Sequence, residues 1–436
     1  MSVSVEHARA ALDRLLVPAP RRATDPVPPA RRAEIGQLTG LRFVAAMWVL
    51  VHHVAFLPVD VYGRWLAPLA PVVDAGPLGV DLFFVLSGFV MARSYLERWE
   101  GAPRPRQALD FVLARLARIW PLYALVVSVF GLWCAARAVL GHDGVITWQA
   151  AQPGLGPGSW LAQLTMTQMW GSPTLDGVSF VLPTWSVSAE WAAYLAFPVL
   201  AVGLWRLRRA PLVVLGALAV GVAAVPALAA AVAGVPALIG APDAAVYPWT
   251  LRVGGGFVAG VLTWLVVRRI PATPAVARRA HVVVLAALAE ITLVIYWAAA
   301  TPPTAALGAP ERLLAAVPVL PVLLGALALA DRGPARWLAG ARMQQGGRLS
   351  YALYLVHFPL VEVTYAAMTR FPALGPGSSG AALLVPHVLV AAVVLAAVAH
   401  RLVEVPAQRR LRAVTARWVR PGGAGRSVAG RDAART

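Results

Sequence analysis

The stretch TGLRFVAAMWVLVHHVAFLP, residues Thr39–Pro58, is apolar enough to enter a bilayer but carries three polar side chains. A helix needs about 20 mostly apolar residues to cross roughly 30 Å of hydrocarbon. Arg42 lies near the start of the stretch, and His52 and His53 lie near its end. Ionisable groups at membrane depth usually face protein or a water-filled cavity, because their transfer into lipid is costly. The stretch therefore predicts a transmembrane helix with a polar side.

The composition extends this prediction to the whole chain. Of 436 residues, 59% are hydrophobic and 13% are charged, and the mean hydropathy is +0.68. These values indicate an integral membrane protein. The net charge of +18 does not indicate nucleic-acid binding, because the arginines fall in clusters between apolar runs. A single cysteine, Cys134, excludes an internal disulfide and a multi-cysteine metal site, and no metal is expected.

Apolar windows predict an all-α polytopic protein with ten transmembrane helices. Cytoplasmic loops collect arginine, and 32 of the 38 arginines fall in alternate connections, so both termini are expected to be cytoplasmic. The connection 141–184 is interpreted as a loop with an interfacial or re-entrant helix. We expect a disordered Arg/Pro-rich tail at 1–37, one membrane domain at 38–405 and a basic tail at 406–436. The ten windows are 40–58, 77–94, 118–140, 185–205, 211–234, 248–267, 280–300, 313–330, 349–369 and 383–402.

The first two spans each carry candidate polar groups. Arg42 and His53 share a helix face, about 16 Å apart along the axis, whereas His52 points about 80° away from Arg42. Arg42 either extends to lipid headgroups or lines a cavity, and His53 is either a satisfied structural group or part of a proton path or catalytic site. Asp81, in the outer part of the second span, is either a helix-end structural acid or a partner for a histidine. Gly88 in the same span is expected to permit close helix packing.

Further polar residues recur at helical spacing in later spans. Arg115 and Arg118 are three residues apart and either mark membrane topology or hold the phosphates of a nucleotide-like donor. Two polar stripes and one weaker site, Arg252, complete the set. The stripes are Ser186, Glu190 and Tyr194 in the fourth span and Ser350, Tyr354 and His357 in the ninth.

A shared cavity would give all these groups partners. Two classes of membrane protein fit such a cavity: a proton-coupled transporter of a small solute or glycan precursor, and an enzyme that performs acid/base chemistry. A P-loop, an HExxH motif and a G-x-S-x-G element are absent from suitable contexts, which disfavours ATPases, zinc proteases and α/β-hydrolases. Composition alone does not choose between the two classes.

Six motifs favour the enzyme over the transporter. Taken together and in their order along the chain, they resemble the motifs of the acyltransferase 3 family of membrane acyltransferases. The resemblance covers about residues 38–412. It matches Arg42 and His53 to the Arg-x10-His pair of the family, and it matches Asp81 and Glu190 to its acidic positions. Arg115 and Arg118 match the pair associated with the acyl-coenzyme A donor. The motifs are LRFVAAMWVLVHH, GVDLFFVLSGF, RLARIWPLY, WSVSAEWAAYLAFP, LSYALYLVHFPL and VEVPAQRRL.

The resemblance implies an O-acyltransferase, most simply an O-acetyltransferase, of a bacterial plasma membrane. Acyl-coenzyme A, with acetyl-coenzyme A expected, is then a co-substrate and no cofactor is bound permanently. His53 would act as general base or carry the acyl group, and Asp81 or Glu190 would orient it or position the acceptor. The acceptor would be a hydroxyl of a glycan, a lipid-linked sugar or a glycosylated secondary metabolite. We expect the acceptor either to reach the membrane cavity itself or to be served by a separate extracytoplasmic partner.

Overall fold

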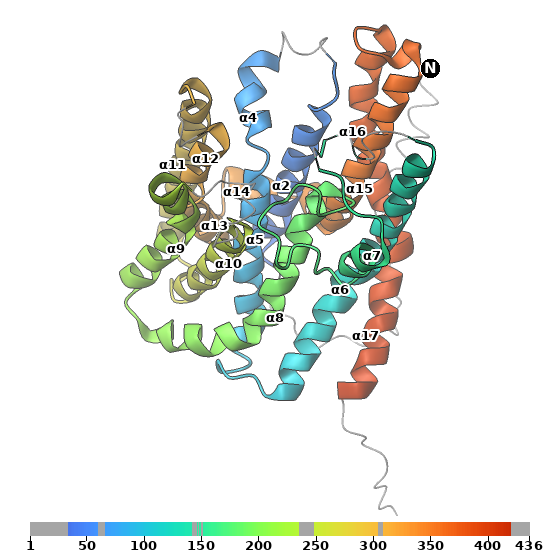
Figure 1. The fold of residues 1–436 in the computed structure, drawn as a ribbon. Coiled ribbons are helices and arrows are strands. Elements are labelled where there is room, and N and C mark those ends of the chain that lie inside the picture. Colours follow the sequence, from blue (N-terminus) through green and yellow to red (C-terminus); the bar gives the residue numbers. More distant parts are fainter. Residues whose placement is uncertain are drawn as a thin grey trace, which may run out of the picture.

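The computed structural model describes residues 34–59, 66–141, 146, 148–149, 151–234, 248–303 and 308–419, and every regular element in these ranges is a helix. Figure 1 shows the long helices gathered into one bundle. The predicted all-α architecture is therefore confirmed. The principal helices are α2 (Gly36–Val54), α5 (Leu78–Met91), α6 (Pro105–Val139), α8 (Trp185–Arg206), α9 (Leu212–Ala233), α10 (Pro248–Val267), α11 (Pro274–Ala300), α13 (Val319–Leu329), α15 (Ala341–Arg370), α16 (Ser379–Ala399) and α17 (Val405–Val419).

Short helices connect the long ones at both ends of the bundle. In Figure 1, the short helices α4 and α12 lie toward the top of the bundle. The opposite end, at the bottom, is formed by two long helices, α17 and the start of α6. The short elements are η2 (Ala67–Leu69), α4 (Ala70–Asp74), η3 (Ala92–Leu96), α7 (Pro157–Leu164), η4 (Leu182–Thr184), η5 (Leu207–Arg209), α12 (Ala309–Leu313), η6 (Leu314–Ala316), α14 (Pro334–Leu338), η7 (Pro372–Leu374) and η8 (His400–Glu404).

Nine helical segments within the described ranges are long and apolar enough to cross a membrane. They account for nine of the ten predicted spans. The tenth is α2, which has 19 residues and spans about 28 Å at 1.5 Å per residue. Arg42, His52 and His53 make α2 less apolar than the other nine. Its packing at the centre of the bundle, chiefly against α15 and also against α5 and α14, explains why these polar groups are tolerated there.

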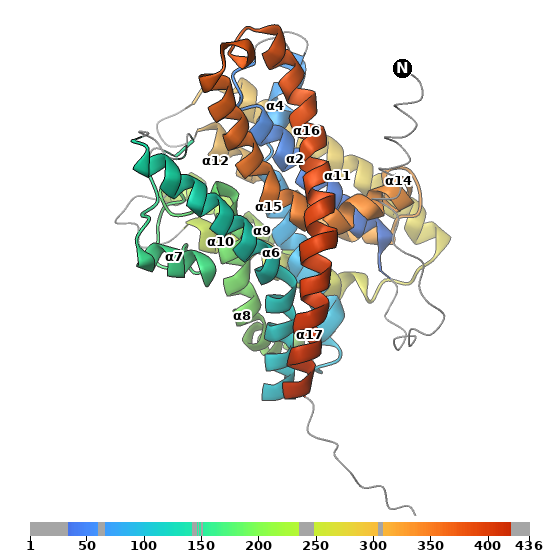
Figure 2. The ribbon, with the colours of Figure 1, turned by 90° about the vertical axis from the view of Figure 1, so that its right-hand side faces the viewer.

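Two helices continue beyond the bilayer-length windows that hydropathy predicts. α6 begins at Pro105 rather than near residue 118, and α16 continues through η8 into α17 as far as Val419. Figure 2 shows α16 and α17 as one column beside α6. The first part of the predicted basic tail is therefore helical. The tail segments 1–33 and 420–436 lie outside the described residues, and the orientation of the termini stays a prediction.

Among its described residues, the long connection after α6 contains one α-helix, α7, and the 3-10 helix η4 just before α8. α7 has eight residues, too few to cross a bilayer, and it packs on α6, where the indole nitrogen of Trp120 donates to the carbonyl of Leu164 at 2.9 Å. The helix expected in this connection is therefore α7, a short helix on the side of the bundle. The rest of the apolar segment 161–170 is turn and loop.

Glycine permits the closest helix contacts in the core. A Cβ at Gly88 of α5 would overlap the backbone carbonyl of Phe257 in α10, and a Cβ at Gly347 of α15 would overlap the carbonyl of Thr39 in α2. The expected role of Gly88 in close packing is confirmed. These contacts bring α5 to α10 and α2 to α15, and these four helices carry His53, Asp81, Arg252 and His357.

Candidate functional site

Two histidines meet where α2 packs on α15. The Nε2 atom of His357 lies 3.2 Å from Nδ1 of His53, and their ring centroids are 5.0 Å apart. Each Nδ1 also faces the carbonyl four residues earlier in its own helix, Val49 at 2.8 Å and Leu353 at 3.1 Å. A carbonyl oxygen can only accept a hydrogen bond, so in the neutral rings each Nδ1 carries the proton. The one proton on Nδ1 of His53 is then shared between the carbonyl of Val49 and Nε2 of His357, and Nε2 of His53 keeps its lone pair.

His52 faces a different part of the bundle, as its helical position predicts. Its Nδ1 lies 3.0 Å from the carbonyl of Val73. Its ring lines a cavity of about 140 Å³ together with Asp81 and Arg252. The rings of His52 and His53 are in edge-to-face contact, with centroids 5.2 Å apart. His52 therefore lies between this cavity and the histidine pair.

Asp81 is held by Arg252 in a buried bidentate ion pair. The guanidinium of Arg252 donates from Nε at 2.9 Å and from Nη2 at 2.6 Å to the two carboxylate oxygens, and the side chains are 2% and 4% exposed. The arginine also lies over the ring of Trp185. A forked pair of this kind fixes both groups. The acid in the second span therefore has Arg252 as its partner, while Val49 and His357 hold the ring of His53.

The polar stripe of α8 joins that helix to α5 through one hydrogen-bonded chain. The hydroxyl of Tyr194 donates to Oε1 of Glu190 at 2.5 Å, and Ser87 donates to the hydroxyl of Tyr194 at 2.9 Å. Glu190 also lies close enough to Tyr351 and Tyr354 for its charge to act on both. The carboxylate of Glu190 therefore faces the interface between α8 and α15.

The first residue of the α8 stripe contacts the stripe of α15. The hydroxyls of Ser186 and Tyr354 are 2.7 Å apart, and Tyr354 donates to the carbonyl of Pro183 at 2.8 Å. Ser350, by contrast, donates to the carbonyl of Gly347 in its own helix at 2.8 Å. The structure thus brings Ser186 and Tyr354 together and gives Ser350 a local structural role.

The predicted donor arginines gather toward the α17 end of the bundle. Arg118 forms an ion pair with the buried carboxylate of Glu404 in η8, and Nη2 of Arg115 lies 3.4 Å from the hydroxyl of Tyr95 in η3. The positive charges of Arg42 and Arg115 both act on Arg118. Three arginines therefore concentrate positive charge in one region, and Glu404 balances part of it.

Tyr351 and Glu404 are residues of this region that helix periodicity did not assign to the site. The guanidinium of Arg118 lies 5.4 Å from the ring centroid of Tyr351, and the hydroxyl of Tyr351 donates to the carbonyl of Ile119 at 2.6 Å. Tyr351 points away from the stripe of α15, as its spacing predicts, but it points toward the arginines. Glu404 occurs in the motif VEVPAQRRL, which was the available signal for it.

Three residues of α15 lie in sequence between the arginines and the histidines, on neighbouring faces of the helix. Tyr351 contacts Arg118, and Tyr354 follows one turn later with its ring centroid 5.8 Å from that of His357. His357 in turn contacts His53. The six steps from Tyr351 to His357 rise by about 9 Å along the helix axis. We call the residues Tyr351, Tyr354 and His357 the α15 ladder.

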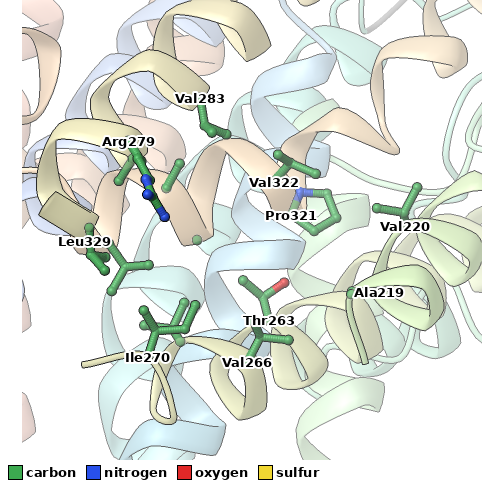
Figure 3. A pocket seen from close by; sticks show the side chains of 16 residues that line it. Ala219, Val220, Thr263, Val266, Ile270, Arg279, Val283, Pro321, Val322 and Leu329 are labelled. Atoms are coloured by element: carbon green, nitrogen blue, oxygen red, sulfur yellow. The ribbon is translucent and has the colours of Figure 1, made fainter. Parts of the chain in front are cut away.

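A larger cavity of about 330 Å³ lies apart from these polar groups, between α9, α10, α11 and α13. Figure 3 shows its lining, in which Thr263 and Arg279 are the polar residues. The hydroxyl of Thr263 donates to the carbonyl of Ala259 at 2.8 Å. This apolar cavity suits a hydrocarbon chain and offers no group for acid/base chemistry.

Comparisons with known proteins identify the family of the chain. The family model of the acyltransferase 3 domain, described as an acyltransferase domain, matches residues 35–401. The chain is 30% identical to acyltransferase MdmB of Streptomyces mycarofaciens over 403 residues, which cover 88% of this chain and 94% of the relative. It is 33% identical over 160 residues to protein 2 in the picA locus of Rhizobium radiobacter, covering 35% of this chain and 75% of that protein. The search of solved structures gave no significant match. The chain is a multi-pass membrane protein that belongs to the acyltransferase 3 family.

Proposed function

We propose that this membrane acyltransferase moves an acyl group from cytoplasmic acyl-coenzyme A to a hydroxyl of a glycan, a lipid-linked sugar or a glycosylated secondary metabolite at the plasma membrane. The observation that carries this proposal is the α15 ladder, which links a cluster of positive charge to a paired histidine. An acyl-coenzyme A thioester has the matching features, because its phosphates are anionic and its reactive carbon is at the far end of a long arm.

The arginine cluster would bind the donor. Phosphate groups accept forked, charge-assisted hydrogen bonds from guanidinium groups. Arg115 is the best candidate for direct contact, since its contact with Tyr95 at 3.4 Å is long for a hydrogen bond. Arg118 is engaged by Glu404 and Tyr351, so it would add positive charge to the site and position Tyr351. Arg42 would contribute from α2.

His53 would act as the general base through Nε2. This atom would take the proton of the acceptor hydroxyl while the hydroxyl oxygen attacks the thioester carbon, and the sulfur would leave as a thiolate that receives the proton. His357 would position the ring by accepting from Nδ1 of His53. A positioned base contributes typically about 10²–10⁴-fold to a rate. If His53 instead carried the acyl group, the same Nε2 atom would be the nucleophile.

Asp81 and Glu190 would take different supporting roles. Asp81 would hold Arg252 at the wall of the cavity beside His52. Glu190, bonded to Tyr194, would keep the interface between α8 and α15 polar along the path of the thioester. The relative from Streptomyces mycarofaciens is named an acyltransferase, which favours this chemistry over the transport of an unmodified solute.

The experiment measures transfer of labelled acetyl from acetyl-coenzyme A by purified protein in detergent, with p-nitrophenyl glycosides as acceptors. His53→Ala should lower the rate at least about 100-fold. His387→Ala is the matched control, because His387 is an exposed histidine that also faces the carbonyl four residues earlier in its helix, and it should keep the wild-type rate. Full activity of His53→Ala would remove the role assigned to His53. If the wild-type protein became acetylated when no acceptor is present, His53 would be an acyl carrier rather than a general base.

A further inference from the structure

The cavity beside His52 is built from the ends of several helices. Besides His52 it is lined by Asp74 of α4, by Asp81 and Arg252 near the starts of α5 and α10, and by Leu313 and Leu314. Its volume of about 140 Å³ is about ten times the roughly 10–15 Å³ needed to hold one water molecule. The cavity therefore has room for a polar group larger than water. Asp74 is exposed, so the cavity has a rim at the protein surface.

Among the described residues, the charges in the lining do not cancel. Asp81 and Arg252 neutralise each other in their ion pair, which leaves the carboxylate of Asp74 on the rim. The charged neighbours on α12 are directed elsewhere: Glu311 accepts from the backbone nitrogen of Gly308 at 3.0 Å, and Arg312 donates to the carbonyl of Thr301 at 2.6 Å. A lining with surplus negative charge repels carboxylates and phosphates and accepts neutral or basic ligands.

His52 offers this cavity a hydrogen-bond acceptor. Its Nδ1 faces the carbonyl of Val73, so in the neutral ring Nδ1 carries the proton and Nε2 carries the lone pair. A hydroxyl of a ligand can donate to that lone pair. The His52 ring also contacts the ring of His53, so a ligand bound beside His52 lies near the residue assigned as base.

We infer that the cavity beside His52 is the acceptor site and that it selects a hydroxyl-bearing ligand without negative charge. This inference rests on the proposed function and names the substrate class that the same site takes. His52 is a positioning residue that orients the acceptor hydroxyl. Asp74 is the residue that rejects anionic acceptors.

The first test compares three p-nitrophenyl glycosides, those of glucose, glucosamine and glucuronic acid, as acceptors of labelled acetyl. Wild-type protein should acylate the first two at least tenfold better than the glucuronide. Asp74→Lys should reduce this ratio at least tenfold, and His52→Phe should raise the acceptor KM at least tenfold while leaving the KM for acetyl-coenzyme A unchanged. An unchanged ratio in Asp74→Lys, or an unchanged acceptor KM in His52→Phe, would overturn the inference.

The second test needs no turnover, so it separates this inference from the proposed function. In a Cys134→Ala chain, Leu314→Cys places a thiol in the cavity wall, and Val317→Cys places one at a similarly buried position that does not line the cavity. Each thiol is treated with a cationic trimethylammonium or an anionic sulfonate methanethiosulfonate, which form a mixed disulfide and release methanesulfinate. Residue 314 should react at least tenfold faster with the cationic reagent, and Asp74→Asn should reduce this preference at least threefold.

Equal reaction with the two reagents, or equal labelling at positions 314 and 317, would overturn the inference. If none of the glycosides is acylated by wild-type protein, the proposed function fails for these acceptors. The labelling ratio then still decides whether the cavity selects against negative charge.

Discussion

The ring nitrogens of His53 and His357 lie 3.2 Å apart although 304 residues separate them in the chain. The contact depends on the close approach of α2 and α15, where Gly347 leaves room for the carbonyl of Thr39. It also depends on the two carbonyls, those of Val49 and Leu353, that orient the rings. The pair is thus fixed by packing and by backbone hydrogen bonds from two helices.

A substitution can test whether His357 positions His53 or only fills space in the core. His357→Phe keeps an aromatic ring of similar size but removes one of the two acceptors that face Nδ1 of His53. We expect kcat to fall at least about tenfold, because the base loses its orientation, and we expect the KM for acetyl-coenzyme A to stay the same. Initial rates at varied acetyl-coenzyme A provide both values. His387→Phe is the control, and a kcat for His357→Phe within twofold of wild type would refute this role.

Two glycines of α10 should respond differently to the same change. A Cβ at Gly260 would overlap the carbonyl of Val85 in α5, whereas a Cβ at Gly254 would meet no atom within 4 Å. Gly260→Ala should destabilise the protein by about 1–3 kcal/mol through overpacking. Gly254→Ala should be neutral or stabilise it by up to about 1 kcal/mol, since alanine favours helix. Thermal unfolding in detergent compares the two, and equal midpoints would contradict the close contact of α5 and α10.

The buried pair of Asp81 and Arg252 should show strong coupling. Asp81→Leu or Arg252→Leu alone leaves a charge buried without its main partner, which costs about 3–5 kcal/mol. The double variant removes both charges, so it should be more stable than either single variant. A double-mutant cycle of unfolding midpoints measures this. If the stability loss of the double variant equals the sum of the losses of the two single variants, the two side chains are not coupled, and the ion pair does not stabilise the buried charge of Asp81.

Substitutions of Arg115 and Arg118 should have different effects on donor binding and on stability, although the two residues lie only three positions apart. Arg115→Ala should raise the KM for acetyl-coenzyme A about 10- to 100-fold, which corresponds to the loss of one charge-assisted hydrogen bond, and it should leave the unfolding midpoint nearly unchanged. Arg118→Ala should lower the midpoint, because the buried carboxylate of Glu404 then loses its arginine and keeps only its contact with His400. Arg106→Ala, at the exposed start of α6, is the control for both. Identical effects of the two substitutions would contradict their separate roles.

Periodicity and hydropathy predicted much of this architecture because both act over a few turns of helix. The polar stripe of α8 is an example, since the hydrogen bond between Glu190 and Tyr194 spans four residues and follows directly from helix geometry. The helical character of nine spans follows equally from their local apolar composition. α2 was also predicted from its apolar window, but it is not among the nine described helices that meet the criterion for spanning. Its polar groups are tolerated because it packs against α15, α5 and α14.

The partners across helices could not be predicted in this way. Asp81 and Arg252 are 171 residues apart, and no local pattern specifies which arginine meets which acid. The same holds for Arg118 and Glu404, whose contact depends on α16 continuing through η8 beside α6. Polar helix extensions beyond the bilayer have no hydropathy signal, so both this ion pair and the full length of α6 required the folded structure.

Chemical rescue tests the assignment of His53 as the catalytic base most directly. His53→Ala leaves a space the size of an imidazole ring next to His357, and added imidazole can supply the missing nitrogen. The account predicts that imidazole raises acetyl transfer by His53→Ala at least tenfold, and that it does not change the rate of the wild type or of a Glu190→Ala variant. A His53→Ala protein that is fully active without imidazole, or one that stays folded and binds acetyl-coenzyme A but shows no rescue, would contradict it.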